Sequence, residues 1–452
     1  MRSTHGLLAS VFLTAGSLAC VAGESGSDSP TDEGGTFTPA GEDAGKPGED
    51  GGTPATDSGT TPSDDSGTPS TDTGTTPTDP PGTPSAKKII AYFAAWGVYG
   101  RNFQVSDIDA SLITHLNYAF ANITSGECVL GDSYADIDKF YPGDSWDAGS
   151  LRGSFHQLQL LKAKSPHLKT LLSIGGWTWS NGFSDAAMTE ASRTKFAKSC
   201  VGLMTKYGFD GLDLDWEYPG GGGLAPGRPE DKQNFTLLLA AIRKEIDAAG
   251  AGHLLSIAVG AAPAVLANLE LSKIHAYLDS INVMTYDFHG GWEKTTGHNS
   301  PLYRAKGETA PVGWDTDAAA TAYISGGVPA SKVIVGGAFY GRGWAGVPAT
   351  NDGLFQSATG PSPGTWEQGV LDYHDIAANY LPTFTRKWDA EAKVPWLYNA
   401  SKQIMISYDD AESLKVRSQY VNTKGLGGLM VWELSGDDKA HTLGHAIRDN
   451  LK

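Results

Sequence analysis

The sequence predicts an α/β protein: a (β/α)8 TIM barrel with a small α+β insertion after its seventh strand, preceded by a disordered acidic linker. Eight short apolar, β-branched runs follow residue 87, and several of the stretches between them have amphipathic helical patterns. Near-continuous apolar strands that alternate with helices are typical of a parallel sheet covered on both faces. Eight such units in roughly 365 residues fit a barrel. The alternative is a doubly wound open sheet, but no glycine-rich nucleotide-binding turn follows the first strand.

The first 20 residues have the pattern of an export signal. A basic start precedes a modest apolar run over residues 7–19, which is too short to span a bilayer. Small residues stand at 17 and 19, at the usual cleavage spacing, and Cys20 follows. This arrangement resembles a bacterial lipoprotein signal, in which that cysteine is lipidated; the alternative is a plain secretory signal with an incidental cysteine. We expect a protein that is secreted or lipid-anchored at the bacterial cell surface, with no transmembrane segment.

Residues 21–86 have the composition of a disordered linker. They are mostly Gly, Ser, Thr, Pro and Asp, with Phe37 as the only aromatic residue. Such a segment cannot bury enough apolar surface to offset the entropy of ordering its backbone. We expect an extended spacer, stiffened by proline and by repulsion among its carboxylates.

The formal net charge of −17 argues against nucleic acid and anionic membranes as partners. Much of this charge is local, because the linker carries about thirteen acidic residues against the single Lys46. The barrel region is therefore only mildly acidic. We expect a monomer that binds neither nucleic acid nor a cofactor.

Two cysteines follow Cys20, at Cys128 and Cys200. In an exported chain they could form a disulfide; the alternative is two buried thiols that pack as small hydrophobes. Two cysteines without histidines at ligand spacing are too few for a zinc site, so we expect no bound metal. No chemistry is assigned to three isolated histidines, His115, His289 and His298.

The barrel domain is predicted over residues 87–452. Its helical patterns are clearest at 190–207 and 228–249. The eight predicted strands cover residues 89–94, 113–120, 170–174, 208–217, 254–259, 281–287, 333–339 and 427–433.

The connection after the seventh strand, between Gly343 and Met405, is too long for a structureless loop. It contains strand-like pieces and several aromatic residues. We therefore predict an α+β insertion subdomain over residues 345–405. It follows the carboxyl end of a barrel strand, which is the end where barrel active sites form.

The segment from Asp210 to Glu217 has the sequence DGLDLDWE. Side chains alternate between the two faces of a strand, so Asp213, Asp215 and Glu217 share one face. The apolar residues between them share the other face, which in a barrel meets the surrounding helices. The three acids are therefore expected to point inward, whereas Asp210 falls on the opposite parity.

Three carboxyl groups in a barrel interior are costly, because burial and mutual repulsion both favour protonation of at least one of them. Glu217 comes at the carboxyl end of its strand, where catalytic groups lie in barrels. A glutamate that keeps its proton there, beside an aspartate, can act as a general acid near neutral pH. The alternatives are a satisfied structural network or a metal site, although hard-cation sites usually need ligands from several loops.

Residues 210–217 resemble the D-x-x-D-x-D-x-E signature of the family-18 glycoside hydrolases, the chitinases. Four further elements, in the family's order, extend the resemblance from about residue 87 to residue 452. They are Ser173-Ile174-Gly175-Gly176 (S-x-G-G), Met284-Thr285-Tyr286-Asp287 (M-x-Y-D), Tyr340-Gly341-Arg342-Gly343-Trp344 (Y-G-R-G-W), and Trp432 near the end of the eighth strand. Each element alone is weak, whereas together they are highly specific. The inserted subdomain is typical of the family's larger, deep-cleft members.

The resemblance implies an endo-acting chitinase that cleaves β-1,4-linked N-acetylglucosamine polymers with retention. The substrate's own acetamido group would be the nucleophile, and an oxazolinium ion would be the intermediate. Glu217 would be the general acid and base. Asp215 would hold the acetamido N–H and share a proton with Asp213. Tyr286 would hydrogen-bond the acetamido group, and Asp287 would support the site.

Aromatic residues are expected to bind the sugars, because flat rings stack on pyranose C–H faces at little entropic cost. By the resemblance, Trp432 is the floor at the cleaved sugar, Trp177 and Trp292 line the leaving-group side, and Trp366 covers the non-reducing side. Trp344 is expected in the same cleft, although for any single tryptophan the alternative is ordinary core packing. The remaining residues expected at the substrate are Tyr92, Phe120, Tyr218, Met284, Tyr340 and Arg342.

Two other functions stay open. A chitin-binding lectin on the same barrel would typically lack the glutamate or the last aspartate, and both are present here. An endo-β-N-acetylglucosaminidase would use the same chemistry on the chitobiose core of glycoprotein glycans. The long insertion and the many aromatic residues favour a linear polymer instead.

Overall fold

The computed structural model describes residues 87–452. The export signal predicted over residues 1–20, Cys20 included, and the linker predicted over residues 21–86 lie outside the described residues. Among the described residues, no helix combines the length and the apolar character needed to cross a membrane.

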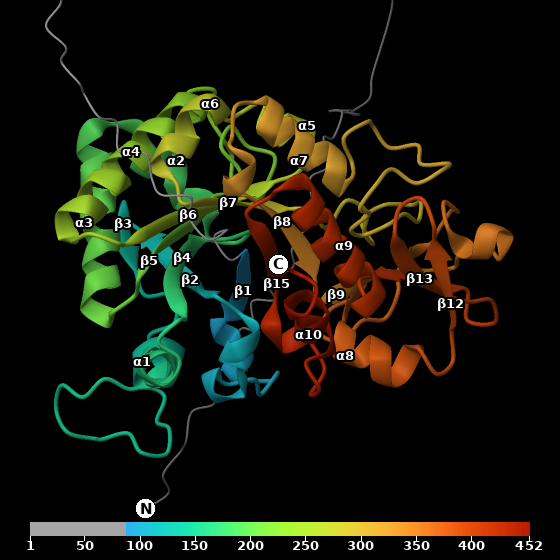
Figure 1. The fold of residues 1–452 in the computed structure, drawn as a ribbon, viewed down its shortest axis with the longest axis horizontal. Coiled ribbons are helices and arrows are strands. Elements are labelled where there is room, and N and C mark those ends of the chain that lie inside the picture. The colour runs from blue at the N-terminus through green and yellow to red at the C-terminus, as the bar shows by residue number, and fades with distance from the viewer. Residues whose placement is uncertain (1–86) are drawn as a thin grey trace, which may run out of the picture. The chain divides into compact units, whose positions relative to one another are not determined.

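The centre of the fold is a closed barrel of eight parallel strands (Figure 1). The strands are hydrogen-bonded in the order β1-β15-β8-β7-β6-β5-β4-β2, and a pairing between β2 and β1 closes the ring. The prediction of a (β/α)8 barrel is confirmed. The bounds of the barrel strands are β1 Lys88–Ala94, β2 His115–Thr124, β4 Lys169–Gly175, β5 Gly211–Asp215, β6 Leu254–Gly260, β7 Ser280–Met284, β8 Val333–Ala338 and β15 Gly428–Trp432.

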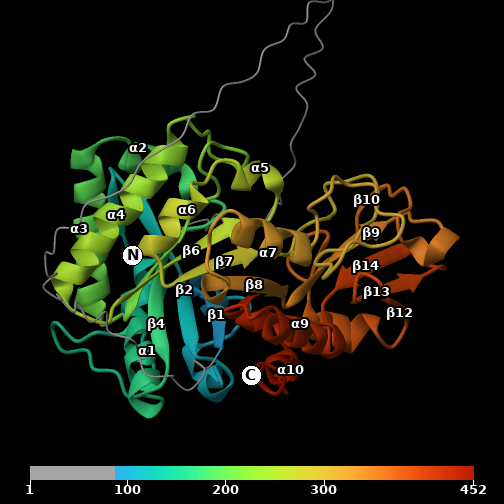
Figure 2. The ribbon, with the colours of Figure 1, turned by 45° about the horizontal axis from the view of Figure 1, so that its top comes forward.

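Helices cover the outside of the barrel, and Figures 1 and 2 show α3 and α4 side by side on it. The bounds of the longer helices are α1 Gly153–Lys164, α2 Phe183–Met188, α3 Glu190–Tyr207, α4 Asp231–Ala249, α7 Thr316–Ser325, α9 Ala411–Lys424 and α10 Thr442–Arg448. The shorter helices are α5 Pro263–Leu266, α6 Leu271–Ile274 and α8 Tyr373–Asp375.

Local sequence sets the bounds of α3 and α4. Helix α3 begins after Thr189, whose hydroxyl accepts from the N–H of Ser192, and ends at Gly208 with a φ of +75°, which favours glycine. Its predicted bounds are confirmed. The helix predicted from residue 228 begins later, at Asp231, because the Asp231 carboxylate accepts the backbone N–H of Arg228 at 2.7 Å and so stabilises a turn there.

Two strands end earlier than predicted, and both lie at the mouth of the barrel. The run 208–217 is a strand only over Gly211–Asp215, and the run 281–287 only over Ser280–Met284. Glu217 and Asp287 therefore lie beyond the hydrogen-bonded ladder. Asp287 has a φ of +58°, which a strand residue does not adopt.

Strand β2 runs further than predicted and continues into a hairpin with β3 (Glu127–Val129), which the sequence did not predict. Cys128 on β3 forms a disulfide with Cys200 on α3, with a Cα–Cα distance of 5.0 Å. Of the two alternatives that the sequence left open for these cysteines, the structure thus has the disulfide.

A second, antiparallel sheet follows β8 and lies beside the barrel (Figure 2). Its order is β10-β9-β14-β13-β12, and β11 also pairs with β9. Its strands are β9 Tyr340–Ala345, β10 Gly360–Pro361, β11 Val370–Asp372, β12 Thr385–Asp389, β13 Val394–Asn399 and β14 Ile404–Tyr408. The sheet starts before and ends after the predicted boundaries 345–405, because β9 pairs along β14, with Trp344 opposite Met405. The residues from Tyr340 to Trp344 are thus a strand of the insertion rather than a loop of the barrel.

Candidate active site

Three acidic side chains lie in the barrel interior at the end of β5. Asp213, Asp215 and Glu217 are 0%, 4% and 8% exposed. The register of β5 against β4 and β6 puts Asp213 beside Ser173 and Ser256. Within residues 87–452, no group of three or more His, Cys, Asp or Glu side chains is arranged to hold a metal ion.

Asp213 is surrounded by hydrogen-bond donors from four strands. Its Oδ2 accepts from the hydroxyls of Tyr92 and Ser173, each at 2.7 Å. Its Oδ1 accepts from Ser256 Oγ at 2.5 Å and from Asn282 Nδ2 at 3.2 Å. Burial raises the pKa of Asp213, although each of these donors acts in the opposite direction. The four donors fix the position of this carboxyl group.

Asp215 and Glu217 are less completely satisfied. Asp215 Oδ1 is buried and has no hydrogen-bond partner among the described residues. Burial, and then the charges of Glu217 and Asp213, raise the pKa of Asp215 well above its usual range. Burial raises the pKa of Glu217 to about 7; the hydrogen bond with Tyr218 opposes this rise and the charge of Asp287 adds to it. Glu217 can therefore hold a proton near neutral pH, as a general acid must.

Ser180 holds the backbone that carries Glu217. The N–H of Glu217 donates to Ser180 Oγ at 2.8 Å. The same hydroxyl lies 2.8 Å from the carbonyl oxygen of Gly176 and 3.1 Å from that of Asp215. Sequence analysis did not identify Ser180, which lies in the connection after β4.

Tyr286 and Asp287 form a turn directly after β7. Burial, and then the charge of Asp215, raise the pKa of Tyr286 well above its usual range, so its hydroxyl remains a donor. The N–H of Asp287 donates to Asn299 Oδ1 at 2.9 Å, and its Oδ1 accepts from Arg342 Nε at 2.7 Å. Because Arg342 belongs to β9, this ion pair ties the second sheet to the barrel mouth.

Asp215 and Glu217 line a cleft of about 690 Å³, whereas Asp213 lies beneath it, fully buried. Trp432 lies in its wall, with its ring stacked on Phe120 at 5.8 Å and 5.4 Å from the ring of Tyr92. The cleft brings together nine of the predicted site residues, namely Tyr92, Phe120, Asp215, Glu217, Tyr218, Met284, Tyr286, Asp287 and Trp432.

A second cavity, of about 460 Å³, adjoins the cleft at Trp432, which lines both. Tyr340 and Arg342, which were predicted to lie at the substrate, line this second cavity. Its remaining polar and aromatic lining was not predicted and includes Trp96, Arg101, Glu367, Asp372 and Glu433. The two cavities are therefore neighbours on either side of Trp432.

Trp366 borders the second cavity without lining it. The residue is 48% exposed, and its Nε1 donates to Asp372 Oδ2 at 2.8 Å. The guanidinium of Arg101 lies 5.1 Å from the ring centre. Since Arg101 and Asp372 both line that cavity, Trp366 stands at its edge.

Trp177 and Trp292 lie outside both cavities. A Cβ added at Gly223 would touch the ring of Trp177 and collide with the carbonyl oxygen of Glu217, so Trp177 lies beside the segment that follows Glu217. Trp292 packs on the guanidinium of Arg342, which lies 5.0 Å from the centre of its ring. Arg342 in turn bonds Asp287.

The expectation that Trp344 faces the cleft is wrong. Trp344 is fully buried among Val347, Trp396, Tyr398 and Met405, in a core of the insertion's own. The reason is that β9 continues past the barrel mouth and ends inside the second sheet.

Trp314 lines the cleft but was not predicted. It lies in the connection between β7 and α7, with its ring centre 5.6 Å from that of His289. His289 is held between Glu293 at 2.9 Å and Glu308 at 3.0 Å. Although burial lowers it, these hydrogen bonds raise the pKa of His289 to about 9. No family motif or spacing marks Trp314, so its role appears only in the folded chain.

Comparison with known proteins agrees with this geometry. Residues 88–437 match the sequence profile described as glycosyl hydrolases family 18. Chitinase A1 of Niallia circulans is 46% identical over 409 residues, which cover 80% of this chain and 58% of that protein. Endochitinase 1 of Metarhizium robertsii is 43% identical over 357 residues, which cover 76% of this chain and 80% of that protein. The chain therefore spans little more than half the length of the first of these relatives.

Solved structures give the same result. Chitinase ChiA74 from Bacillus thuringiensis superposes with a TM-score of 0.77 at 44% identity, covering 81% of this chain and 70% of that one. The catalytic domain of the psychrophilic chitinase B from Arthrobacter TAD20 superposes with a TM-score of 0.75 at 35% identity, covering 81% and 96%. The resemblance inferred from five sequence elements is thus confirmed, and this chain belongs to the glycosyl hydrolases of family 18.

Proposed function

We propose that this protein is an endo-acting chitinase that hydrolyses β-1,4-linked N-acetylglucosamine polymers by a retaining, substrate-assisted mechanism. One observation carries the proposal: a glutamate able to hold a proton near neutral pH stands two residues from a buried carboxyl oxygen without a partner. A mechanism with an enzyme nucleophile needs a second carboxylate that attacks C1, whereas a substrate-assisted one needs an anion beside the acetamido nitrogen. Asp215 Oδ1 supplies an acceptor of that kind.

In the proposed first step, Glu217 gives its proton to the glycosidic oxygen as the bond from C1 to that oxygen breaks. The acetamido carbonyl oxygen of the same sugar attacks C1, which closes an oxazolinium ring. Asp215 passes its proton to Asp213, accepts the acetamido N–H and offsets the positive charge of the ring as a carboxylate. Tyr286 donates its hydroxyl to the acetamido group. The leaving sugar departs with the transferred proton.

In the second step, water attacks C1 and the ionised Glu217 takes a proton from it. The bond between C1 and the acetamido oxygen breaks, so the product keeps the β configuration and Glu217 regains its proton. Asp213, which four donors hold in place, stays next to Asp215 throughout this cycle and shares a proton with it.

The aromatic wall of the cleft supports a sugar polymer as the substrate. Trp432, Tyr92 and Phe120 form a cluster of rings at the acids, and Trp432 continues into the second cavity. Rings of this kind stack on the C–H faces of pyranoses. The relatives named as chitinases support the same substrate, chitin or a chito-oligosaccharide.

The test is incubation of the protein with chitin hexasaccharide, with products followed by mass and by anomeric form. Release of short oligomers in the β form is the expected result. Tight binding without cleavage would favour a lectin and contradict the proposal. If neither occurs, release of glycans from a glycoprotein would establish an endo-β-N-acetylglucosaminidase instead.

We also propose that the protein is an exported monomer, either secreted or lipid-anchored through Cys20. The N-terminal sequence pattern supports export. Metabolic labelling with a fatty acid, compared between the natural protein and Cys20→Ser, separates the two forms: label on the natural protein alone establishes the anchor. Size-exclusion chromatography with light scattering tests the monomer.

A further inference from the structure

A buried ion pair outside the cleft borders the turn that carries Tyr286 and Asp287. Arg417 on α9 and Asp409, which follows β14, have side chains that are 1% and 0% exposed, with 3.5 Å between Nη2 and Oδ1. We propose that this pair is a positioning device for residues 285–287, so that Arg417 and Asp409 govern turnover without touching the substrate. The inference rests on the proposed function, because it assigns the pair a part in that reaction.

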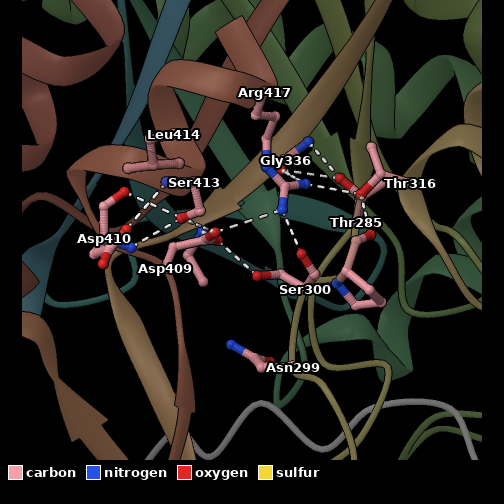
Figure 3. A network of polar contacts seen from close by, with 12 residues as sticks. Thr285, Asn299, Ser300, Thr316, Gly336, Asp409, Asp410, Ser413, Leu414 and Arg417 are labelled. Atoms are coloured by element: carbon pink, nitrogen blue, oxygen red, sulfur yellow. Dashed lines mark hydrogen bonds and ion pairs between the residues drawn. The ribbon is translucent and has the colours of Figure 1, made fainter. Parts of the chain in front are cut away.

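Arg417 reaches three separate segments of the chain (Figure 3). Its Nη1 donates to Thr316 Oγ1 at 2.8 Å and to the carbonyl oxygen of Gly336 at 2.9 Å. Its Nη2 donates to the carbonyl oxygen of Ser300. The guanidinium therefore joins the start of α7, the middle of β8 and the connection after β7.

Asp409 completes the same group from the other side. Its Oδ2 accepts from Ser300 Oγ at 2.6 Å and from the N–H of Ala338 at 3.2 Å, and its Oδ1 accepts from Ser413 Oγ at 2.7 Å. Ser300 is thus bonded by both members of the ion pair, through its carbonyl and through its hydroxyl.

One end of the catalytic turn is fixed through Gly336. Thr285 Oγ1 donates to the carbonyl oxygen of Gly336 at 2.9 Å and accepts its N–H at 2.8 Å. That carbonyl oxygen also accepts from Arg417. The ring of Tyr286 lies on Gly336 so closely that an added Cβ would come within 2.7 Å of it. A shift of Gly336 would therefore move both Thr285 and Tyr286.

The other end of the turn is fixed through Asn299, the neighbour of Ser300. Asn299 Oδ1 accepts the N–H of Asp287 at 2.9 Å, and its carbonyl oxygen accepts the N–H of Phe288 at 3.0 Å. Asp287 needs such support, because a φ of +58° is uncommon for a residue with a side chain. The ion pair thus holds the segment that holds Asp287.

The choice of a buried ion pair also suggests that Arg417 and Asp409 position the turn 285–287 rather than stabilise the fold. Burying two charges costs solvation energy, and apolar residues of similar volume often replace a buried ion pair without loss of stability. Loss of only one partner, in contrast, leaves an uncompensated buried charge. The double variant Arg417→Met/Asp409→Leu therefore separates the two roles.

The test compares the full-length natural protein with this double variant, with Arg417→Lys, and with Arg386→Met as a matched control. Arg386 forms a more exposed pair with Asp410, one residue from Asp409. In the double variant we expect kcat on chitin hexasaccharide to fall by about tenfold or more, because small misplacements of catalytic groups are costly, while KM changes by less than about twofold. We expect Arg417→Lys to recover part of that loss and Arg386→Met to keep the natural kcat.

Two further readouts separate positioning from folding. The double variant should bind a thiazoline analogue of the oxazolinium ion more weakly, by about the factor lost in kcat, at a temperature where its circular dichroism is native. A crystal structure of this variant should show Asp287 displaced from Asn299 or Arg342. A double variant with natural kcat and an unmoved turn would overturn the inference. Failure of the natural protein to cleave the hexasaccharide would instead overturn the proposed function, and the crystal structure would still decide this inference.

Discussion

Two groups of buried charge flank the turn 285–287, and they are satisfied in different ways. Around Arg417 and Asp409, the charges are paired, and both Nη atoms of Arg417 and both carboxylate oxygens of Asp409 bond to surrounding segments, although Arg417 Nε has no partner among the described residues. At the end of β5, Asp213 is equally well bonded, but Asp215 keeps a buried oxygen without a partner beside Glu217. Paired charges that are bonded on several sides fix geometry, whereas an unpartnered carboxyl oxygen at a cleft, such as that of Asp215, keeps capacity for a ligand. Inside this barrel, an unpartnered carboxyl oxygen thus indicates where a ligand can bind.

Among the variants of these buried charges, Glu217→Gln should lose the most activity. The amide keeps the shape of the side chain but has no acidic proton, so we expect kcat on chitin hexasaccharide to fall by about 10³-fold. Binding of the hexasaccharide, measured by calorimetry, should be retained. The exposed Glu391→Gln is the control and should keep natural activity. A Glu217→Gln protein with most of its activity would remove Glu217 from the mechanism.

A second variant, Asp215→Asn, tests the unpartnered oxygen. The asparagine removes the anion that faces the positive oxazolinium ring, and we expect kcat to fall by about 10²-fold with a smaller change in KM. Steady-state kinetics on the hexasaccharide measure this split. Equal losses in kcat and in substrate affinity would mean that Asp215 shapes the cleft rather than stabilising the intermediate.

The pH dependence of kcat tests whether Glu217 holds a proton near neutral pH. The pKa of Glu217 is raised to about 7, and only the protonated form can donate. On the alkaline side, activity should therefore fall about tenfold for each unit above that pH. Rates from pH 4 to pH 9 would show this limb. An alkaline limb near the ordinary pKa of a glutamate would mean that burial does not hold the proton on Glu217.

The smallest effect concerns the third buried charge group, His289 between Glu293 and Glu308. The pKa of His289 is raised from 6.5 to about 9, and that of Glu308 is lowered from 4.5 to about 2. The stabilisation from His289 is complete below pH 6.5 and is lost as pH rises through about 9; that from Glu308 is complete above pH 4.5 and is lost as pH falls through about 2. We expect His289→Gln to melt roughly 2–4 °C lower than the natural protein between pH 5 and pH 6.5. Calorimetry should show the difference closing above pH 9; a constant difference would contradict an ionic contribution.

Sequence alone predicted the barrel and its acid ladder because both depend on local periodicity. The alternation of Asp213, Asp215 and Glu217 with apolar residues survives in the fold, since strand β5 has the period of two that the pattern requires. Trp432, in contrast, was expected in the cleft because of the resemblance to the family. The ends of β5 and β7 were not predictable, because Glu217 and Asp287 leave the ladder under tertiary contacts.

The insertion was the least predictable part. Strand β9 follows β8 almost directly, so no turn signal in the sequence shows that the chain has entered a second sheet. Trp344 was consequently expected in the cleft and lies in a separate core. Trp314 and Ser180 were missed for a related reason: each comes from a connection whose path is set by contacts distant in sequence, such as those of His289.

Gly336 has a practical consequence for anyone redesigning this protein. Because the ring of Tyr286 occupies the space that a Cβ would need, codon 336 is closed to all nineteen other amino acids unless that ring moves. Libraries meant to retune sugar selectivity should leave this position unrandomised and diversify the rim near Trp366 and Trp314 instead. Among survivors of random mutagenesis selected for activity, glycine should be the residue found at 336.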